Sequence, residues 1–300
     1  MPHNMSASAN TDAKSTWTSI SDPTRRKIKH SPAWKIMRTT LLVLMSLVVL
    51  IPLTWTFISS FKTPAELAAR PPKLFPESWN FDNYTNALAQ FDFGTYIGNS
   101  VFVTLTATIL TVVINVMCAY GLAKYNFRGR NVLFLVVLAT IMVPLQVIFI
   151  PVYQMAASLG LVNSLWGMII PPAAPPTGVF LIRQYMLSIP DELIEASRVD
   201  GSGEFNTFLR VVVPLCGPPI AVVTIFSIMW RWNDFLWPKI IAQDSNLYTL
   251  PVALAQFSSQ LTVPFNYLLA MSVVSMLPVI IVFLFLQKYI VAGIANTGIK

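Results

Sequence analysis

The stretch EASRVDGSGEFNTFLRVVVP, Glu195–Pro214, is a polar interruption in the second half of a very apolar chain. The 52 residues before Arg183, from Asn131 to Ile182, contain no charged side chain. Residues 183–210 then contain eight, namely Arg183, Asp191, Glu192, Glu195, Arg198, Asp200, Glu204 and Arg210. This contrast predicts a water-exposed loop between segments that lie in a membrane.

The composition of the whole chain supports a membrane protein. Of its 300 residues, 55% are hydrophobic and 11% are charged, with a mean hydropathy of +0.62. A soluble domain has about 25% charged residues, and a membrane-spanning helix needs about 20 apolar residues. The long uncharged runs therefore predict an all-α integral membrane protein with six transmembrane helices, at about residues 37–59, 97–121, 132–154, 163–183, 213–234 and 266–289. Because these runs are continuous and do not alternate, they disfavour a β-barrel.

Basic residues predict the orientation. With both termini in the cytoplasm, fifteen of the 20 lysines and arginines fall inside and four fall outside, while Arg231 lies in the fifth span. Such asymmetry is the positive-inside pattern of a multi-pass protein in the cell (inner or plasma) membrane, where lipid is a partner. The net charge of +7 is therefore attributed to basic residues that orient the chain in the membrane, and nucleic-acid binding is not expected. We expect residues 1–35 to form a polar, mobile cytoplasmic tail and residues 36–300 to form the membrane domain.

This topology places the loop of residues 184–214 in the cytoplasm, between the fourth and fifth spans. Ser188 followed by Pro190 and Asp191 is typical of a helix start. Gly201 predicts a helix stop, because glycine accepts the left-handed backbone conformation that ends helices, and Ser202 can cap the next helix. The loop is thus predicted to be two short helices joined by a tight turn.

Two interpretations of this loop are open on physical grounds. An amphipathic segment could rest on the lipid headgroups, but the loop carries five acids against Arg198 and Arg210, and anionic lipids repel acids. Alternatively, the small residues Ala196 and Ser197 beside Glu195 could let a protein partner approach closely. The charge balance favours the protein partner.

The spacing of the loop resembles the signature of the permease subunits of binding-protein-dependent ABC importers. That signature is E-A-A, three residues, G, nine residues, then I-x-L-P, and this chain has Glu195-Ala196-Ser197, Gly201 and Val211-Val212-Val213-Pro214 at the same spacing. The departures, Ser for the second Ala and Val for Ile and Leu, keep the size class. The resemblance extends from about Ser60 to the end. The segments Ser60–Leu88, Ser164–Gly201, Trp232–Pro238 and Tyr248–Leu254 look like the maltose-type or glycerol-phosphate-type second permease subunit.

This resemblance implies a function and a set of partners. The loop would be the coupling helix that docks on a cytoplasmic ATPase through Glu195, Ala196, Ser197, Asp200, Gly201 and Pro214. The chain would form half of the translocation pathway of a carbohydrate importer, together with a second permease subunit, two ABC ATPase subunits and an extracytoplasmic substrate-binding protein. ATP and magnesium would be bound by the ATPase and not by this chain. A glycerol-phosphate importer is the nearest alternative.

The segment around Trp232–Pro238 suggests a substrate pathway. Trp230, Trp232, Asn233 and Asp234 combine aromatic faces with polar groups, which suits a sugar, although tryptophans are also common at membrane interfaces. The prolines at 171, 172, 175 and 176 predict a break in the fourth span, which either marks a transport site or is a plain kink. By contrast, Pro144, Pro151 and Pro278 are expected to be kinks that neighbouring helices accommodate.

Several features are missing from the sequence. It has no G-x-x-x-x-G-K-[ST] phosphate loop, so ATP hydrolysis by this chain is not expected. Its two histidines, His3 and His30, lie in the tail, and its cysteines, Cys118 and Cys216, make no metal-binding pattern, so neither catalytic residues nor a metal site are expected. No acid is expected in the middle of a span, and Asp234 lies near an outer end. Because proton- or sodium-driven transporters usually bury such acids, this absence disfavours a stand-alone secondary transporter. A non-transporting scaffold is a further alternative. The sequence leaves open which carbohydrate is carried and whether this subunit contacts it.

Overall fold

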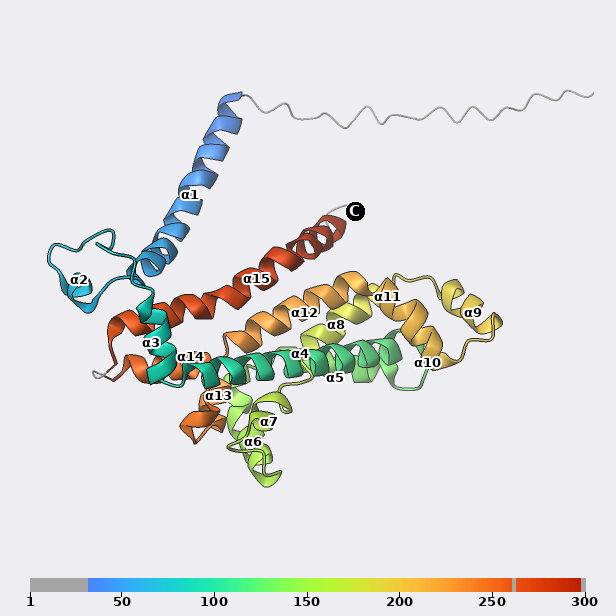
Figure 1. Cartoon of the computed structure of the whole chain (residues 1–300). Coiled ribbons are helices and arrows are strands. Elements are labelled where there is room, and N and C mark those ends of the chain that lie inside the picture. Colours follow the sequence, from blue (N-terminus) through green and yellow to red (C-terminus); the bar gives the residue numbers. More distant parts are fainter. Residues whose placement is uncertain (1–31, 261–262, 298–300) are drawn as a thin grey trace, which may run out of the picture. The chain divides into compact units, whose positions relative to one another are not determined.

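The computed structural model describes residues 32–260 and 263–297, and all regular secondary structure in these residues is helical (Figure 1). Two compact units are present, one ending at Pro52 and the other starting at Leu53. Residues 1–31 of the predicted tail lie outside the described residues. The helices are α1 Pro32–Ser59, α2 Pro64–Ala68, α3 Asp82–Gln90, α4 Phe93–Lys124, α5 Arg130–Ile141, α6 Leu145–Ser158, α7 Leu165–Ile169, α8 Pro176–Met186, α9 Asp191–Val199, α10 Glu204–Thr207, the π-helix η1 Phe208–Val212, α11 Val213–Leu215, α12 Gly217–Trp232, α13 Leu236–Ile241, the 3₁₀-helix η2 Ser245–Leu247, α14 Leu250–Ser258 and α15 Phe265–Thr297.

Three of the predicted spans are found as long, continuous apolar helices. Segments long and apolar enough to cross a membrane are Pro32–Ser59, Phe93–Lys124 and Phe265–Phe285, which match the predictions at 37–59, 97–121 and 266–289. The all-helical class with several apolar helices is thereby confirmed. Two further pairs qualify only if each is counted as one bent span: Arg130–Ile141 with Leu145–Ser158, and Glu204–Leu215 with Gly217–Trp232.

The predicted third span, residues 132–154, is wrong as a single helix. Its two halves, α5 and α6, meet at an angle of 107°. The break falls at Pro144, which has an extended backbone and precedes α6. Proline disfavours helical geometry in the residue before it and removes a backbone donor, so the helix ends at Ile141. Pro144 is therefore a break and not the expected kink, whereas Pro151 and Pro278 do lie inside continuous helices.

The predicted break in the fourth span is confirmed. The segment 163–183 contains the short helix α7 and the start of α8, separated by an irregular stretch that holds the prolines. Pro175 has an extended backbone, and Pro176 occupies the first turn of α8, where a missing N–H costs nothing. Neither helix is long enough to span a membrane alone.

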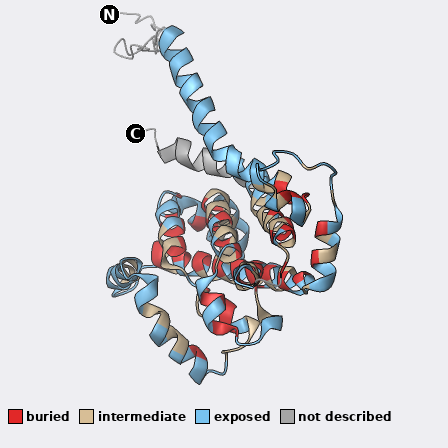
Figure 2. Cartoon of the chain, turned by 90° about the vertical axis from the view of Figure 1, so that its left-hand side faces the viewer, coloured by how far each residue is buried: buried red, intermediate tan, exposed pale blue. Residues whose placement is uncertain are grey.

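The second unit is built around α4, which packs lengthwise against α8 and α12 (Figure 1). In turn, α12 packs against α15, and α15 against α3. Buried residues gather on these central helices, whereas every residue of α1 except Ser59 is at least partly exposed (Figure 2). Three apolar clusters lie along α4, at its two ends and in its middle.

One of these clusters, the α9 cluster, joins the polar loop to the helical bundle. It contains Ile194 of α9 and ten further buried residues from α4, α8, α12 and the segments beside them: Val116, Ala119, Tyr120, Ala123, Ile182, Met186, Ile189, Val212, Cys216 and Val223. Ile194 is 3% exposed, whereas its neighbour Leu193 is 45% exposed. The loop is therefore packed on the bundle by one face of α9 and leaves the other face open.

Replacement of Ile194 by alanine tests this anchoring. The Ile194→Ala variant should lose about 2–5 kcal/mol of stability, because it leaves a cavity in a packed cluster. Leu193→Ala, at an exposed neighbouring position, should change stability by less than about 0.5 kcal/mol. Thermal unfolding of both variants in detergent provides the comparison, and equal effects would contradict the anchoring.

Candidate functional site

The polar loop folds into a short helix with a glycine stop, as the sequence predicts. Asp191 and Glu192 occupy the first turn of α9, where acids complement the helix dipole. At its end, the Gly201 N–H donates to the Arg198 carbonyl at 3.0 Å, and the Ser202 N–H donates to the Ser197 carbonyl at 3.0 Å. This pair of bonds is a Schellman motif, and Gly201 adopts the left-handed φ of 81° that the motif requires.

The predicted caps of the loop helices differ from those observed. Ser188 does not cap α9; its hydroxyl donates to the Tyr185 carbonyl, and Pro190 is the N-cap residue. Ser202 does not cap the following helix, because Gly203 holds that position with no side-chain bond. Both helices therefore start without a side-chain cap, and the positions of the serines did not predict their first residues.

Pro214 lies at the far end of the loop, inside α11. A proline ring clashes with the carbonyl four residues earlier and offers no N–H donor. The π-helix η1 ends two residues before it, and such local widening is a common way to fit an irregularity into a helical run. Pro214 therefore accounts for the widened turn η1, whereas the bend of 77° into α12 falls after Leu215, next to Pro218 and Pro219. It is distant in sequence from the turn at Gly201.

Three side-chain bonds tie the loop to the end of α4. Lys124 Nζ donates to the Ile189 carbonyl and to Asp191 Oδ1, both at 2.6 Å. The Tyr125 hydroxyl donates to Glu204 Oε2 at 2.8 Å. These bonds connect the start of α9 and the start of α10 to the end of α4, the helix that runs the length of the second unit.

Glu204 also links the two loop helices to each other. Its other carboxylate oxygen accepts from Arg198 Nε at 2.8 Å, and Ser197 Oγ lies 3.0 Å from Thr207 Oγ1. The hydrogen bonds from Arg198 and Tyr125 hold the pKa of Glu204 below its ordinary value. The same bond to Glu204 raises the pKa of Tyr125 to about 12. Glu204 is thus an acceptor for two donors that come from different elements.

Five of the six predicted docking residues are exposed, and Ser197 is half-buried. Glu195, Ala196 and Asp200 are exposed on or beside α9, and Gly201 forms the turn. Ser197 is half-buried because its hydroxyl faces Thr207. Large apolar side chains are also exposed on this tip: Val199 is 87% exposed and Phe205 is 71% exposed. The loop therefore presents an acid, a small residue and uncovered apolar surface together.

The glycine stop makes a specific prediction. Gly201→Ala should destabilise the loop by about 1–2 kcal/mol, the cost of a left-handed backbone for a residue with a Cβ. Gly203→Ala is the matched control, because Gly203 has an ordinary φ of −68° and both sites are open to an added Cβ. Hydrogen exchange of α9 measures the effect. Equal protection in the two variants would show that the turn does not need glycine.

The ion pairs predict a loop that loosens in acid. The pKa values of Asp191 and Glu204 are both depressed, by the hydrogen bond from Lys124 and by that from Arg198 respectively. A depressed folded-state pKa stabilises above the ordinary value, about 4 for these acids, and this stabilisation is lost as the pH falls through the depressed pKa.

A nitroxide label measures this loosening. Attached at Val199→Cys in a chain with Cys118 and Cys216 replaced by alanine, the label should become more mobile below about pH 4. Glu204→Gln should already be more mobile at pH 7 and should respond less to acid. Unchanged mobility between pH 7 and pH 3 in the parent chain would contradict the role of these bonds.

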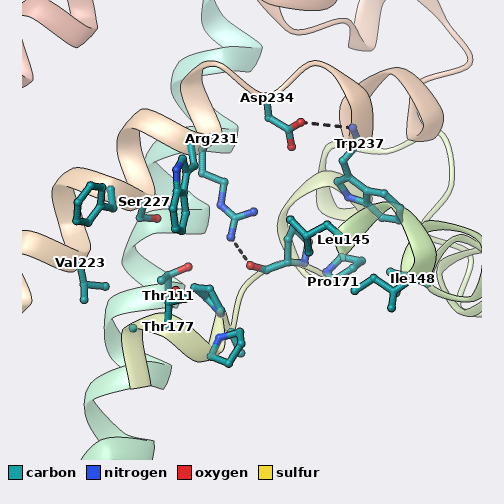
Figure 3. A pocket seen from close by; sticks show the side chains of 18 of the residues that line it. Thr111, Leu145, Ile148, Pro171, Thr177, Val223, Ser227, Arg231, Asp234 and Trp237 are labelled. Carbon is teal, nitrogen blue, oxygen red and sulfur yellow. Dashed lines mark hydrogen bonds between the residues drawn. The ribbon is translucent and has the colours of Figure 1, made fainter. Parts of the chain in front are cut away.

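A cavity of about 580 Å³ lies farther along the bundle. It is bounded by α4, α6, α8, α12, α13 and the proline-containing segment between α7 and α8 (Figure 3). Its aromatic walls include Trp230, which stacks on Phe226 with ring centroids 5.9 Å apart, and Trp237, which lies 6.0 Å from Phe149. Aromatic faces beside a few polar groups are the usual composition of a small-molecule site.

Two charged side chains face this cavity. Arg231 donates to the Pro172 carbonyl, and Asp234 Oδ1 accepts from the Trp237 N–H at 3.4 Å (Figure 3). Each charged group therefore has a backbone partner of its own. Thr111, Thr177 and Ser227 add hydroxyl groups to the lining.

Only two of the four predicted pathway residues line the cavity. Trp230 and Asp234 do so, whereas Trp232 is buried in another cluster and donates from Nε1 to the Ser275 carbonyl at 2.8 Å. Asn233 donates to the Met229 carbonyl and caps the end of α12. Helical periodicity could have distinguished Trp230, which faces the cavity, from Trp232, which does not. The cavity-lining residues of α12 recur at spacings of three and four: Val223, Phe226, Ser227, Trp230 and Arg231.

The sequence interpretation also missed a polar stripe on α4. Five buried polar residues recur along one face of this helix, at Ser100, Thr104, Thr108, Thr111 and Asn115. The opposite face exposes Val101, Leu105, Ile109, Val113 and Met117. Several stripe residues bond to neighbours: Ser100 accepts from the Leu250 N–H, Thr108 faces Ser227, and Thr111 donates to the Ala173 carbonyl. The spacing was visible in the sequence, but an apolar run hides it when only hydrophobicity is considered.

The chain belongs to the family of binding-protein-dependent transport system inner membrane components, whose pattern matches residues 115–296. It is therefore a multi-pass component of the inner membrane, and its family is a transport family. In the described residues, no group of three or more His, Cys, Asp or Glu could hold a metal ion.

Named relatives narrow the class to sugar permeases of ABC transporters. The chain is 36% identical over 282 residues to the arabinooligosaccharides transport system permease protein AraQ of Bacillus subtilis, covering 91% of this chain and 99% of that one. It is 33% identical over 260 residues to the diacetylchitobiose uptake system permease protein NgcG of Streptomyces coelicolor, covering 85% and 86%. A chain in the crystal structure of a bacterial ABC transporter for the acidic polysaccharide alginate superposes with a TM-score of 0.79 at 26% identity, covering 87% and 98%.

Proposed function

We propose that this chain is one permease subunit of an ABC importer for a carbohydrate and forms half of its translocation pathway. The observation that carries this proposal is the loop of residues 184–214. It has the family spacing, exposes Glu195 and Ala196, and is tied by Lys124 and Tyr125 to the helix that lines the cavity. Docking surface and solute cavity are thus connected by one continuous helix.

The partners follow from the proposed role. A binding-protein-dependent system delivers its solute from a separate substrate-binding protein, and this chain would receive it together with a second permease subunit. Two cytoplasmic ATPase subunits would bind ATP and magnesium and accept the loop. The topology that serves this arrangement has six spans with both termini in the cytoplasm. The bent pair of α5 with α6 and the pair of α7 with α8 would then supply the third and fourth spans.

Coupling would proceed by rigid-body movement. Nucleotide-driven closure of the ATPase would move α9, and Ile194, Lys124 and Tyr125 would pass that movement to α4. Since packed helices shift between discrete arrangements, such a displacement changes access to the cavity between α4, α8 and α12. Glu195 would pair with a basic residue of the ATPase.

The cavity favours a neutral sugar over glycerol phosphate. Sugars bind aromatic faces and exchange hydrogen bonds with charged groups, which Trp230, Arg231 and Asp234 offer, and hydroxyl groups also line the cavity. A doubly charged phosphate would meet one cation beside an acid. Competition in an uptake assay between a labelled arabinooligosaccharide or diacetylchitobiose and glycerol 3-phosphate decides between the two classes.

Charge reversal at Glu195 tests the docking role. Glu195→Lys should lower ATP-driven sugar uptake at least about tenfold while the protein stays in the membrane, because a charge-assisted hydrogen bond contributes about 1.5–3 kcal/mol. Glu192→Lys, another exposed acid on α9 outside the family spacing, is the control. Wild-type uptake in the Glu195→Lys strain, or uptake that survives ATP depletion and fails with the proton gradient, would refute the proposal.

Two neighbouring tryptophans separate a pathway role from a structural one. Trp230→Ala should reduce uptake about tenfold with little loss of stability, since truncating an exposed contact residue costs about 1.4 kcal/mol of binding. Trp232→Ala should instead destabilise the protein by about 3–5 kcal/mol, because it empties a buried site. The two readouts are uptake and thermal unfolding in detergent. Full uptake in Trp230→Ala would remove Trp230 from the pathway.

A further inference from the structure

Asn115 is a buried amide that the fold leaves without a partner. Its residue has no exposed surface, and neither Oδ1 nor Nδ2 forms a hydrogen bond within the part of the chain that the structure describes. Native structures pair nearly all buried polar groups, and an unpaired amide inside a membrane protein is costly. Polar side chains inside a membrane bundle either bond across helices or contact the solute, and Asn115 has no bond across helices.

The amide lies directly behind the wall of the cavity. Its Nδ2 packs so closely on α8 that a Cβ added to Gly178 would come within 1.9 Å of it. The same added Cβ would lie 3.3 Å from Val223 of α12. Gly178 and Val223 both line the cavity, as does Thr111, one turn earlier on α4. Figure 3 shows Thr111 and Val223 on this wall.

Beyond Asn115 the polar stripe of α4 ends. The next buried residues of this helix, Val116 and Ala119, belong to the α9 cluster with Ile182 and Val223. Asn115 is therefore the last residue of the polar stripe before the apolar α9 cluster begins. A glycine opposite the amide keeps the two helices in contact there and offers no side chain of its own.

We propose that Asn115 is a second binding station for the sugar, covered in this structure and uncovered when α8 separates from α4. An amide offers a donor and an acceptor side by side, and two adjacent sugar hydroxyls match this pair. In the present arrangement Gly178 covers the amide, so the station is closed. The station rests on the proposed transport function, because it is the movement of α9 and α4 that opens it.

Thiol accessibility in the assembled complex tests the opening. Asn115→Cys is introduced into a chain with Cys118 and Cys216 replaced by alanine, and a water-soluble maleimide is applied to membranes without nucleotide and with ATP plus vanadate. Ala174→Cys, at an exposed position in the cavity, is the positive control, and Ala119→Cys, in the apolar cluster, is the negative control. We expect labelling at position 115 to differ at least about tenfold between the two states.

The controls separate failure of the station from failure of the transport function. Equally slow labelling at position 115 in both states, with Ala174→Cys responding to nucleotide, overturns the station and leaves the importer intact. No response at either position overturns both. If Asn115→Cys does not assemble, the double variant Asn115→Ala with Gly178→Cys places the thiol in the space that the amide leaves. It tests the same contact between α4 and α8.

An isosteric change tests the binding itself. Asn115→Leu fills the contact between α4 and α8 with an apolar side chain of similar size. If Asn115 were only structural, this change would leave the stability of the protein unchanged or raise it. We expect the complex to assemble and hydrolyse ATP normally. We also expect uptake of an arabinooligosaccharide or diacetylchitobiose, whichever the wild type transports, to fall at least about tenfold. Normal uptake in Asn115→Leu would overturn the binding role.

Discussion

The second unit depends on a constraint that acts on α4. A helix surrounded by lipid and protein must satisfy its polar side chains internally. The stripe from Ser100 to Asn115 therefore faces α8, α12 and the segments near them, while the opposite face exposes Val101, Ile109 and Met117. The polar face of α4 is thus buried and its apolar face exposed, and Thr111 on the buried polar face lines the cavity. Ser227 of α12, the Ala173 carbonyl before α8 and the Leu250 N–H of α14 supply hydrogen bonds to three residues of the stripe.

The end of the same helix controls the polar loop. Lys124 and Tyr125, its last residue and the one after it, hold the beginning of α9 and the beginning of α10 respectively. Ile194 adds apolar packing beneath. One helix thus carries part of the cavity wall, the covered amide of Asn115 and the attachment of the loop, which is the connection that the proposed coupling uses.

The sequence predicted the parts of this structure that depend on local chemistry. Gly201 ends α9 because only a residue without a Cβ accepts its backbone conformation freely, and the prolines after α7 break the helix as expected. The family spacing of Glu195 to Pro214 located the loop. Long apolar helices such as α4 were predicted within a few residues of their ends.

What the sequence interpretation missed depends on packing between distant elements. Pro144 breaks a span where Pro151 does not, and only the surroundings of each proline distinguish them. The separation of Trp232, which is buried, from Trp230, which faces the cavity, is an exception, because the helical spacing along α12 already indicated it. The contact of Asn115 with Gly178 joins residues far apart in the chain, so neither residue alone predicts it.

Site-directed cross-linking tests the central claim most directly. A photoreactive group attached at Ala196→Cys, in a chain free of other cysteines, is activated in intact membranes, and the cross-linked partner is sequenced. The account predicts a protein with a G-x-x-x-x-G-K-[ST] phosphate loop at position 196 and none at Ala157→Cys, a control on α6. Cross-links to lipid alone at Ala196→Cys, in membranes that still take up the sugar, would contradict it.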